Sequence, residues 1–260
     1  MKFHPDFVDN FEYVQTRYFI FDICEIKIVL KVYGEFEKLS KFRKYCTELF
    51  KLILPITNHK KDIINITIYD ISRKKNLPER YKPIESKHIN SGYTFMNSDT
   101  QSTNIVIYRN QELFKVLTHE LLHFFNVIPH SHELQNLFQK KFKSVANTIN
   151  VNEALVEVNA LILNCMIVSK LKNRDLQELL KNEYEFSKTQ VSKLLYQQDV
   201  KLEDIFIDSF TWNEQTNAFS YFVLKHLFLH KYMDTTNTIV DIPITTKLSS
   251  KGIRMSLIEL

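Results

Sequence analysis

A short stretch of the chain, His119-Glu-Leu-Leu-His123, carries side chains that could bind a metal ion and activate a water molecule. On an α-helix, residues four positions apart lie on the same face, so His119 and His123 can offer two imidazoles to one ion. Glu120 stands beside the first histidine, where it can take a proton from the activated water. This H-E-x-x-H pattern predicts a zinc-type site on a helix.

The surroundings of the pattern decide between a metal site and an accidental match. The alternative is a pair of core histidines with ordinary hydrogen bonds, because a pattern this short can arise by chance. Burying two histidines is costly unless something satisfies their ring nitrogens, and a metal ion does so. Apolar residues recur here at helical spacing, as expected of a buried helix: Leu113, Val116, Leu117, Leu121, Phe124 and Phe125. We therefore favour the metal site.

A catalytic zinc ion needs three protein ligands and one open position, so a third ligand must come from elsewhere in the chain. One candidate is Glu153, which opens a strongly periodic helix expected over residues 152–170. Glu157 lies on the same face one turn later. One carboxylate could bind the metal while the other hydrogen-bonds the outer nitrogen of a ligating histidine. Glu153 and Glu157 lie beside the apolar stripe of this helix, where carboxylates need a cation. This favours the metal-site interpretation over two acids on a solvated face.

His130, with His132 nearby, is the competing third ligand. In the extended pattern H-E-x-x-H-x-x-G-x-x-H the last histidine falls on Pro129, so the register is off by one residue. The glycine position of that pattern is Asn126, which can adopt the left-handed turn required there. A surface loop accounts for His130 and His132 just as well, so we rank Glu153 first.

The composition excludes several classes of function. The 260 residues suffice for one large domain or two joined lobes, and a net charge of +4 is too small to indicate nucleic-acid binding. The N-terminus lacks the apolar core of a signal peptide, and four charged residues interrupt the apolar run over residues 18–32, so no membrane span is expected. Cys24, Cys46 and Cys165 fit buried thiols in a reducing compartment. We expect an intracellular, cytoplasmic protein, and the sequence leaves its oligomeric state open.

Hydrophobic periodicity places strands before residue 110 and helices after it, which predicts an α+β fold. Strands are expected over residues 17–33 (one long strand or a hairpin), 62–71, 91–96 and 103–108, with a turn over 97–102 and a loop over 72–90. Helices are expected over residues 35–54, 133–146, 152–170, 175–195 (one or two helices with exposed charge) and 213–232. Asn110 is the expected N-cap of the motif helix.

The chain resembles the zincin metallopeptidases, in the gluzincin branch where a glutamate is the third zinc ligand, as in thermolysin. Three features carry the resemblance: the His119-Glu-Leu-Leu-His123 helix, the segment Asn152-Glu-Ala-Leu-Val-Glu157 in place of the family's N-E-A-x-x-D, and the strand pair before the motif helix. The gap of 30 residues between His123 and Glu153 is wider than in thermolysin. The composition is also similar to that of zinc proteases of large DNA viruses.

The resemblance implies a zincin-like α+β fold that forms one catalytic unit. Residues 1–127 would form an N-terminal lobe with a mixed sheet and the motif helix, and residues 128–260 a mostly helical lobe, with the cleft between them. In the family, the edge strand of the sheet binds the peptide substrate as an added strand. This assigns substrate contacts to Gly92, Tyr93 and Thr94.

The resemblance also implies one Zn²⁺ ion per chain, bound by His119, His123 and Glu153. The reaction would be hydrolysis of a peptide bond in a peptide or protein substrate, with Glu120 as the general base. Glu157 would hold a histidine ligand in place. Endopeptidase and exopeptidase action stay open at this point.

A donor to the oxyanion would come from Tyr221 or His226, both on the aromatic helix expected over residues 213–232. Core packing accounts for either residue singly, and we favour Tyr221 slightly. The alternative to an enzyme is a catalytically inactive protein of the same fold that binds a partner peptide or protein in its groove.

Overall fold

The computed structural model describes residues 15–57, 63–70, 72, 74–96, 103–145, 147–207, 210–233 and 250–260. Its strands are β1 (Thr16–Ile23), β2 (Ile26–Tyr33), β3 (Ile63–Tyr69), β4 (Gly92–Met96) and β5 (Thr103–Ile107). Its helices are α1 (Leu39–Ile53), α2 (Ser86–Ile89), α3 (Leu113–Phe124), α4 (His132–Lys141), α5 (Val151–Lys172), α6 (Leu176–Gln198), α7 (Leu202–Ile207) and α8 (Lys225–Tyr232), with a π-helical turn over Phe219–Leu224 before α8. The expected α+β class, with strands first and helices after, is confirmed.

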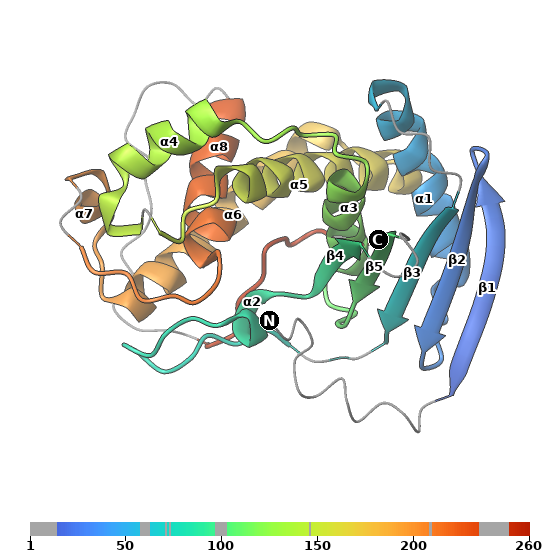
Figure 1. The fold of residues 1–260 in the computed structure, drawn as a ribbon, viewed down its shortest axis with the longest axis horizontal. Coiled ribbons are helices and arrows are strands. Elements are labelled where there is room, and N and C mark those ends of the chain that lie inside the picture. Colours follow the sequence, from blue (N-terminus) through green and yellow to red (C-terminus); the bar gives the residue numbers. More distant parts are fainter. Residues whose placement is uncertain are drawn as a thin grey trace.

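The five strands form one mixed sheet in the order β1-β2-β3-β5-β4. Strands β2, β3 and β5 run parallel, while β1 and β4 are antiparallel to their neighbours at the two ends. Figure 1 shows the sheet at one end of the molecule and α4, α6, α7 and α8 at the other, with α3 and α5 between them. The motif helix therefore lies where the sheet meets the helical part.

The first two strands form the hairpin that was one of the two expectations for this stretch. Its two-residue turn consists of Cys24 and Glu25, both with positive φ, as the twist of such tight hairpins requires. Cys24 is exposed in this turn, so the expectation of a buried thiol is wrong there. Cys46 and Cys165 are buried free cysteines, as expected.

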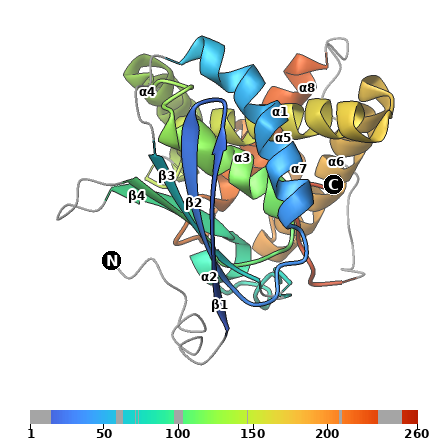
Figure 2. The ribbon, with the colours of Figure 1, turned by 90° about the vertical axis from the view of Figure 1, so that its right-hand side faces the viewer.

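Alternating apolar residues explain why the sheet packs against helices on one face. In β2 the side chains of Ile28, Leu30 and Val32 are buried, and in β3 those of Ile64, Ile66 and Ile68. These side chains share one core with the apolar side of α1, which includes Phe42 and Leu49. Figure 2 shows α1 lying along this face of the sheet.

Gly92 brings the end strand β4 close to the motif helix. A Cβ atom at this position would lie 2.9 Å from the carbonyl oxygen of Val106, 3.0 Å from Cγ1 of Val116 and 3.3 Å from Oε1 of Glu120. Real Cβ atoms do not fit such spaces without displacing their neighbours, and one of these neighbours is backbone. Gly92 therefore sets the spacing between the sheet edge and α3.

The start of α3 differs from the expectation. Glu112, not Asn110, occupies the N-cap position, with a left-handed backbone (φ 60°). The Asn110 amide instead donates hydrogen bonds to Asp70 Oδ1 at 3.0 Å and to Ser72 Oγ at 3.2 Å. Asn110 thus ties the loop after β3 to the entry of α3, and the helix begins three residues later.

Two expected helices also differ in detail. Residues 213–217 are not helical, and Ile84 N donates to Asn213 O while Gln215 N donates to Ile84 O, which holds residues 213–215 beside Ile84. The stretch after the N-cap Asp175 forms a single helix, α6, whose Glu178, Lys181 and Glu185 are exposed as expected, while Glu183 is fully buried. The expected loop over residues 72–90 contains the short helix α2. The turn expected over 97–102 lies outside the described residues, and the division into lobes at 127/128 stays a prediction.

Within the described part of the chain, α5 is long and apolar enough to cross a membrane by length and composition alone. Of its most apolar window, 56% is buried inside the protein. The helix packs against α3, α6, α8 and the π-helical turn. These contacts make α5 the central core helix.

Candidate metal centre

Helix α3 presents the two histidines of the motif from an almost fully enclosed position. Of its 12 residues, only His123 is not buried. The helix packs on β4 and β5 on one side and on α5 on the other. This packing follows from its apolar sequence, and it fixes the rotation of the helix, so that His119 and His123 point toward the first turn of α5.

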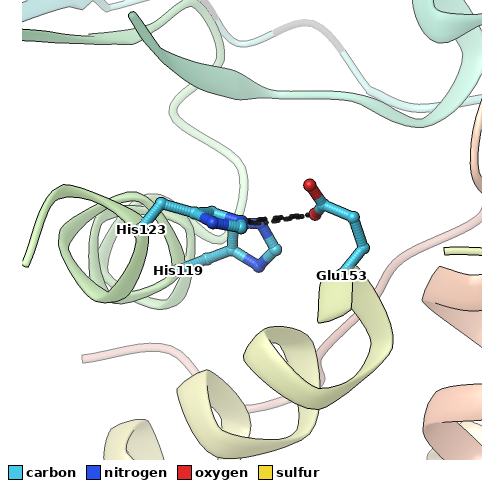
Figure 3. A group of neighbouring side chains, drawn as sticks. All are labelled: His119, His123 and Glu153. Atoms are coloured by element: carbon cyan, nitrogen blue, oxygen red, sulfur yellow. Dashed lines mark hydrogen bonds and ion pairs between the residues drawn. The ribbon is translucent and has the colours of Figure 1, made fainter. Parts of the chain in front are cut away.

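Glu153 meets the two histidines from α5, as Figure 3 shows. The two histidine Nε2 atoms lie 3.2 Å apart. Oε2 of Glu153 lies 3.3 Å from Nε2 of His119 and 3.3 Å from Nε2 of His123. These three ligand atoms form a nearly equilateral triangle, and the group could hold a metal ion.

This triangle matches the donor set of a catalytic zinc ion. Tetrahedral zinc has bonds of about 2.0–2.1 Å to nitrogen and oxygen, which places neighbouring ligand atoms about 3.3 Å apart. Two imidazoles and one carboxylate are also a known combination of ligands for such an ion, which keeps its fourth position open. The residues therefore fit zinc in both chemistry and spacing.

Burial and charge favour protonation states that suit metal binding. Burial lowers the pKa of His119 to about 4, so its imidazole is neutral at pH 7. Burial alone would raise the pKa of Glu153, but hydrogen bonds and charge from the two histidines outweigh it and hold the pKa below its usual range. Burial alone would lower the pKa of His123, but the hydrogen bond and charge of Glu153 and the charge of Glu120 outweigh it and hold the pKa above its usual value. A metal ion held by these residues would therefore compete with a proton chiefly at His123.

The position of Glu153 follows from the N-terminus of α5. Asn150 is the N-cap, and its side-chain oxygen accepts a hydrogen bond from the Glu153 backbone N–H at 3.2 Å. This cap fixes where the helix begins, so Glu153 lies in the first turn, directly across from α3. A carboxylate is also favourable near a helix N-terminus.

Glu157 lies one turn further along α5, against the far side of His119. Its Oε2 atom is 2.8 Å from Nδ1 of His119, a contact whose distance, but not whose angle, is that of a hydrogen bond. Its Oε1 atom pairs with the buried ammonium group of Lys115. The structure thus brings Glu157 to the outer nitrogen of a candidate ligand, where the sequence had placed it.

Glu120 faces the end strand of the sheet and is held there by Thr94. The Thr94 hydroxyl donates to Oε2 of Glu120 at 2.8 Å and to its backbone oxygen at 3.1 Å. Burial raises the pKa of Glu120 to about 7, although the Thr94 hydrogen bond acts in the opposite direction. A carboxyl group with a pKa near neutrality is suited to accept and return a proton.

Tyr221 reaches the site from the π-helical turn. Its hydroxyl donates to Oε2 of Glu153 at 3.2 Å, and its ring centre lies 6.1 Å from that of His119. Burial and the nearby Glu153 charge keep the pKa of Tyr221 well above its usual value, so its hydroxyl remains a donor. Single turns of π-helix often occur at functional sites.

An open cavity of about 500 Å³ lies over the cluster. Residues of β4, including Gly92, Tyr93 and Thr94, form one wall, and the two histidines, Glu153 and Tyr221 form another part of it. The three substrate-binding candidates of the sequence are thus brought together with the metal candidates. The cavity has the volume of a ligand site.

His226 and the loop histidines lie elsewhere. The His226 ring is fully buried, with Nδ1 3.1 Å from Ser187 Oγ, and it stacks on Tyr184. It is not among the residues that line the cavity, so the structure does not bring it to the cluster. His130 and His132 are exposed and pair with each other at a ring distance of 5.0 Å. Neither is part of the described metal group.

Comparisons with protein-family models and with curated proteins give no match for this chain. Among solved structures, the chain is similar to an aminopeptidase N family protein from Idiomarina loihiensis, at 10% sequence identity and a TM-score of 0.37. The alignment covers 81% of this chain and 36% of that protein, so the chain spans about a third of its length. We draw no conclusion about activity from a similarity this low.

The sequence reasoning missed Lys115, which is 1% exposed and pairs with Glu157. One signal was present, because Lys115 stands four residues before His119 and therefore on the ligand face of the same helix. A lysine within an otherwise apolar stretch of a buried helix needs an anionic partner. The identity of that partner depends on how α3 and α5 meet, which the sequence pattern does not specify.

The choice between Glu153 and His130 can be tested by measuring zinc affinity in competition with a chromogenic chelator. Glu153→Ala removes one corner of the triangle, so we expect the affinity to fall by more than about 100-fold, beyond the range for residues that only orient a ligand. His130→Ala is the control and should leave the affinity unchanged. The reverse result would assign the third ligand to the histidine loop.

Proposed function

We propose that this protein is a zinc-dependent peptidase that hydrolyses peptide bonds. The observation that carries the proposal is the 3.2–3.3 Å triangle of His119, His123 and Glu153, with the buried Glu120 beside it and an end strand across the cavity. A structural zinc site is normally closed by four protein ligands, whereas this group has three and opens on a cavity. The arrangement therefore favours catalysis.

In the proposed reaction, three residues bind the metal ion and Glu120 transfers the proton. When bound by His119, His123 and Glu153, zinc polarises the scissile carbonyl group and makes a water molecule more acidic. Glu120 accepts the proton of the attacking water and passes it to the leaving amine, so that no net proton is consumed on the enzyme. Burial keeps bulk water away from Glu120, which strengthens this role.

The substrate is an extended peptide that adds to the sheet along β4. This strand is at the end of the described sheet and lines the cavity beside Glu120. Backbone hydrogen bonds to a strand do not depend on sequence, and alternate side chains provide selectivity. Tyr93, half-buried on β4, is placed to contact one such side chain.

Glu120→Gln separates an enzyme from a protein that only binds peptides. Zinc content should stay at one ion per chain, because Glu120 is not a corner of the triangle, while turnover of a peptide library falls by at least about 100-fold. Glu185→Gln, at an exposed position on α6, is the control. Retained turnover in Glu120→Gln would remove the proposed mechanism. No turnover in the unaltered protein, with zinc bound, would favour the peptide-binding alternative.

Thr94→Val should alter the pH dependence of turnover. The carboxylate form of Glu120 is the active base, so activity is present above its pKa and lost as the pH falls through it. Loss of the Thr94 hydrogen bond destabilises that carboxylate and raises its pKa. We expect the acidic limb of kcat/KM to move up by about one pH unit, the effect of one hydrogen bond to a charged group. Thr67→Val on β3 is the matched change, and an unmoved limb in Thr94→Val would contradict the assignment.

Tyr221 is the proposed donor to the oxyanion, because its hydroxyl already points to the metal group. Tyr221→Phe should lower kcat by about 100-fold with little change in KM, as for loss of one donor that acts only in the transition state. His226→Gln, in the buried pocket with Ser187, is the comparison. A larger loss of kcat in the folded His226 variant than in Tyr221→Phe would reverse this assignment.

A further inference from the structure

A third polar residue lies on the ligand face of α3, one turn before His119. Lys115 is 1% exposed, and its ammonium group pairs with Oε1 of Glu157 on α5. The other oxygen of Glu157 lies 2.8 Å from Nδ1 of His119. The carboxylate thus has one oxygen committed to the lysine and one directed at the candidate ligand.

Lys115 belongs to a set of buried Lys and Glu residues that we call the buried charge cluster: Lys75, Glu112, Lys115, Glu157, Glu183 and Lys225. Each is at most 2% exposed, and the formal charges of the six balance. Lys75 pairs with Glu112 at 2.6 Å, and Lys225 donates to the backbone oxygen of Met255 at 2.8 Å. Because removing a charge from such surroundings leaves a partner uncompensated, each member is held in place.

Lys115 is confined on its remaining side as well. Its Nζ atom lies 3.7 Å from Sδ of Met255, in the segment over residues 250–260. The space between Lys115, Glu157, His119 and Glu120 is only about 30 Å³, room for water and not for a side chain of a substrate. Lys115 is 1% exposed, and the contacts described for its ammonium group are with its protein neighbours Glu157 and Met255.

We propose that Lys115 is a positioning residue of the metal centre, which holds the Glu157 carboxylate in the rotamer that places its Oε2 atom against Nδ1, the outer ring nitrogen of His119. A histidine ligand whose outer nitrogen is held by a carboxylate keeps one tautomer and one ring orientation, with Nε2 free for the metal. The ammonium group also supplies the opposite charge that a carboxylate needs at this depth. This inference rests on the proposed metal site and is independent of peptidase activity.

Lys115→Met tests the proposal through zinc affinity, measured by chelator competition at fixed pH. We expect an affinity about tenfold lower, the lower end of the range for residues that support a metal ligand. Lys225→Met is the matched control, because it removes another fully buried lysine of the same cluster that does not touch Glu157. That control should lose stability to denaturant but keep its zinc affinity within about twofold. Equal losses of affinity in the two variants would overturn the proposal.

A double-mutant cycle shows whether Lys115 acts through Glu157. Lys115→Met should change zinc affinity by less than about twofold when Glu157 is already Gln, because the carboxylate that it positions is absent. A full tenfold loss in that background would overturn the proposed route. Lys115→Gln replaces Lys115→Met if the latter does not fold, with a smaller loss expected because the amide still donates. If the unaltered protein does not bind zinc, the proposed function itself is refuted. If the unaltered protein binds zinc and Lys115→Met binds it equally well, only this inference is refuted.

Discussion

The structure depends on one constraint, the free energy required to bury charged and ionisable groups between α3 and α5. These two helices pack together along apolar faces, yet they carry His119, Glu120, Glu153 and Glu157 into that contact. Groups of this kind are stable in a protein interior only when each has a partner of opposite charge or a hydrogen bond. Three arrangements satisfy this demand: the contacts of Glu153 with the two histidines, the hydrogen bond from Thr94 to Glu120, and the Lys115–Glu157 pair.

The surrounding fold keeps these partners in register. Gly92 lets the end strand of the sheet approach α3 closely enough for Thr94 to bond Glu120. Asn150 determines where α5 begins and so which residue of its first turn faces the histidines. Neither residue carries a reacting group of the proposed reaction. Both fix the positions of the neighbouring groups to within a few tenths of an ångström. Proton transfer and metal binding are sensitive to displacements of that size.

The parts of the site that the sequence predicted are those encoded by spacing within one helix. His119 and His123 are four apart, as are Glu153 and Glu157, so their shared faces follow from helical geometry alone. The Lys115–Glu157 pair joins positions 42 apart, and Glu183 reaches residues more than 70 positions away, so neither follows from local periodicity. Tyr221 and His226 are five apart and cannot both face one cleft from a regular helix. The extended pairing of Ile84 with Asn213 and Gln215, which delays the last helix, likewise depends on segments that meet only in the folded chain.

The segment over residues 253–258 has a consequence for the order of folding. It is held by side chains from the N-cap of α3, from α6 and from α8: Glu112 accepts from Ser256 N, Glu183 accepts from Leu257 N and Ile258 N, and Lys225 donates to Met255 O. Glu112 and Ser256 are 144 positions apart, a contact of very high sequence separation that forms slowly and late. The buried groups of Glu112, Glu183 and Lys225 therefore obtain these partners only once residues 255–258 are in place. Lys115, which pairs with Glu157 beside His119, also contacts Met255, so the surroundings of the candidate metal site are complete only when this segment is in place.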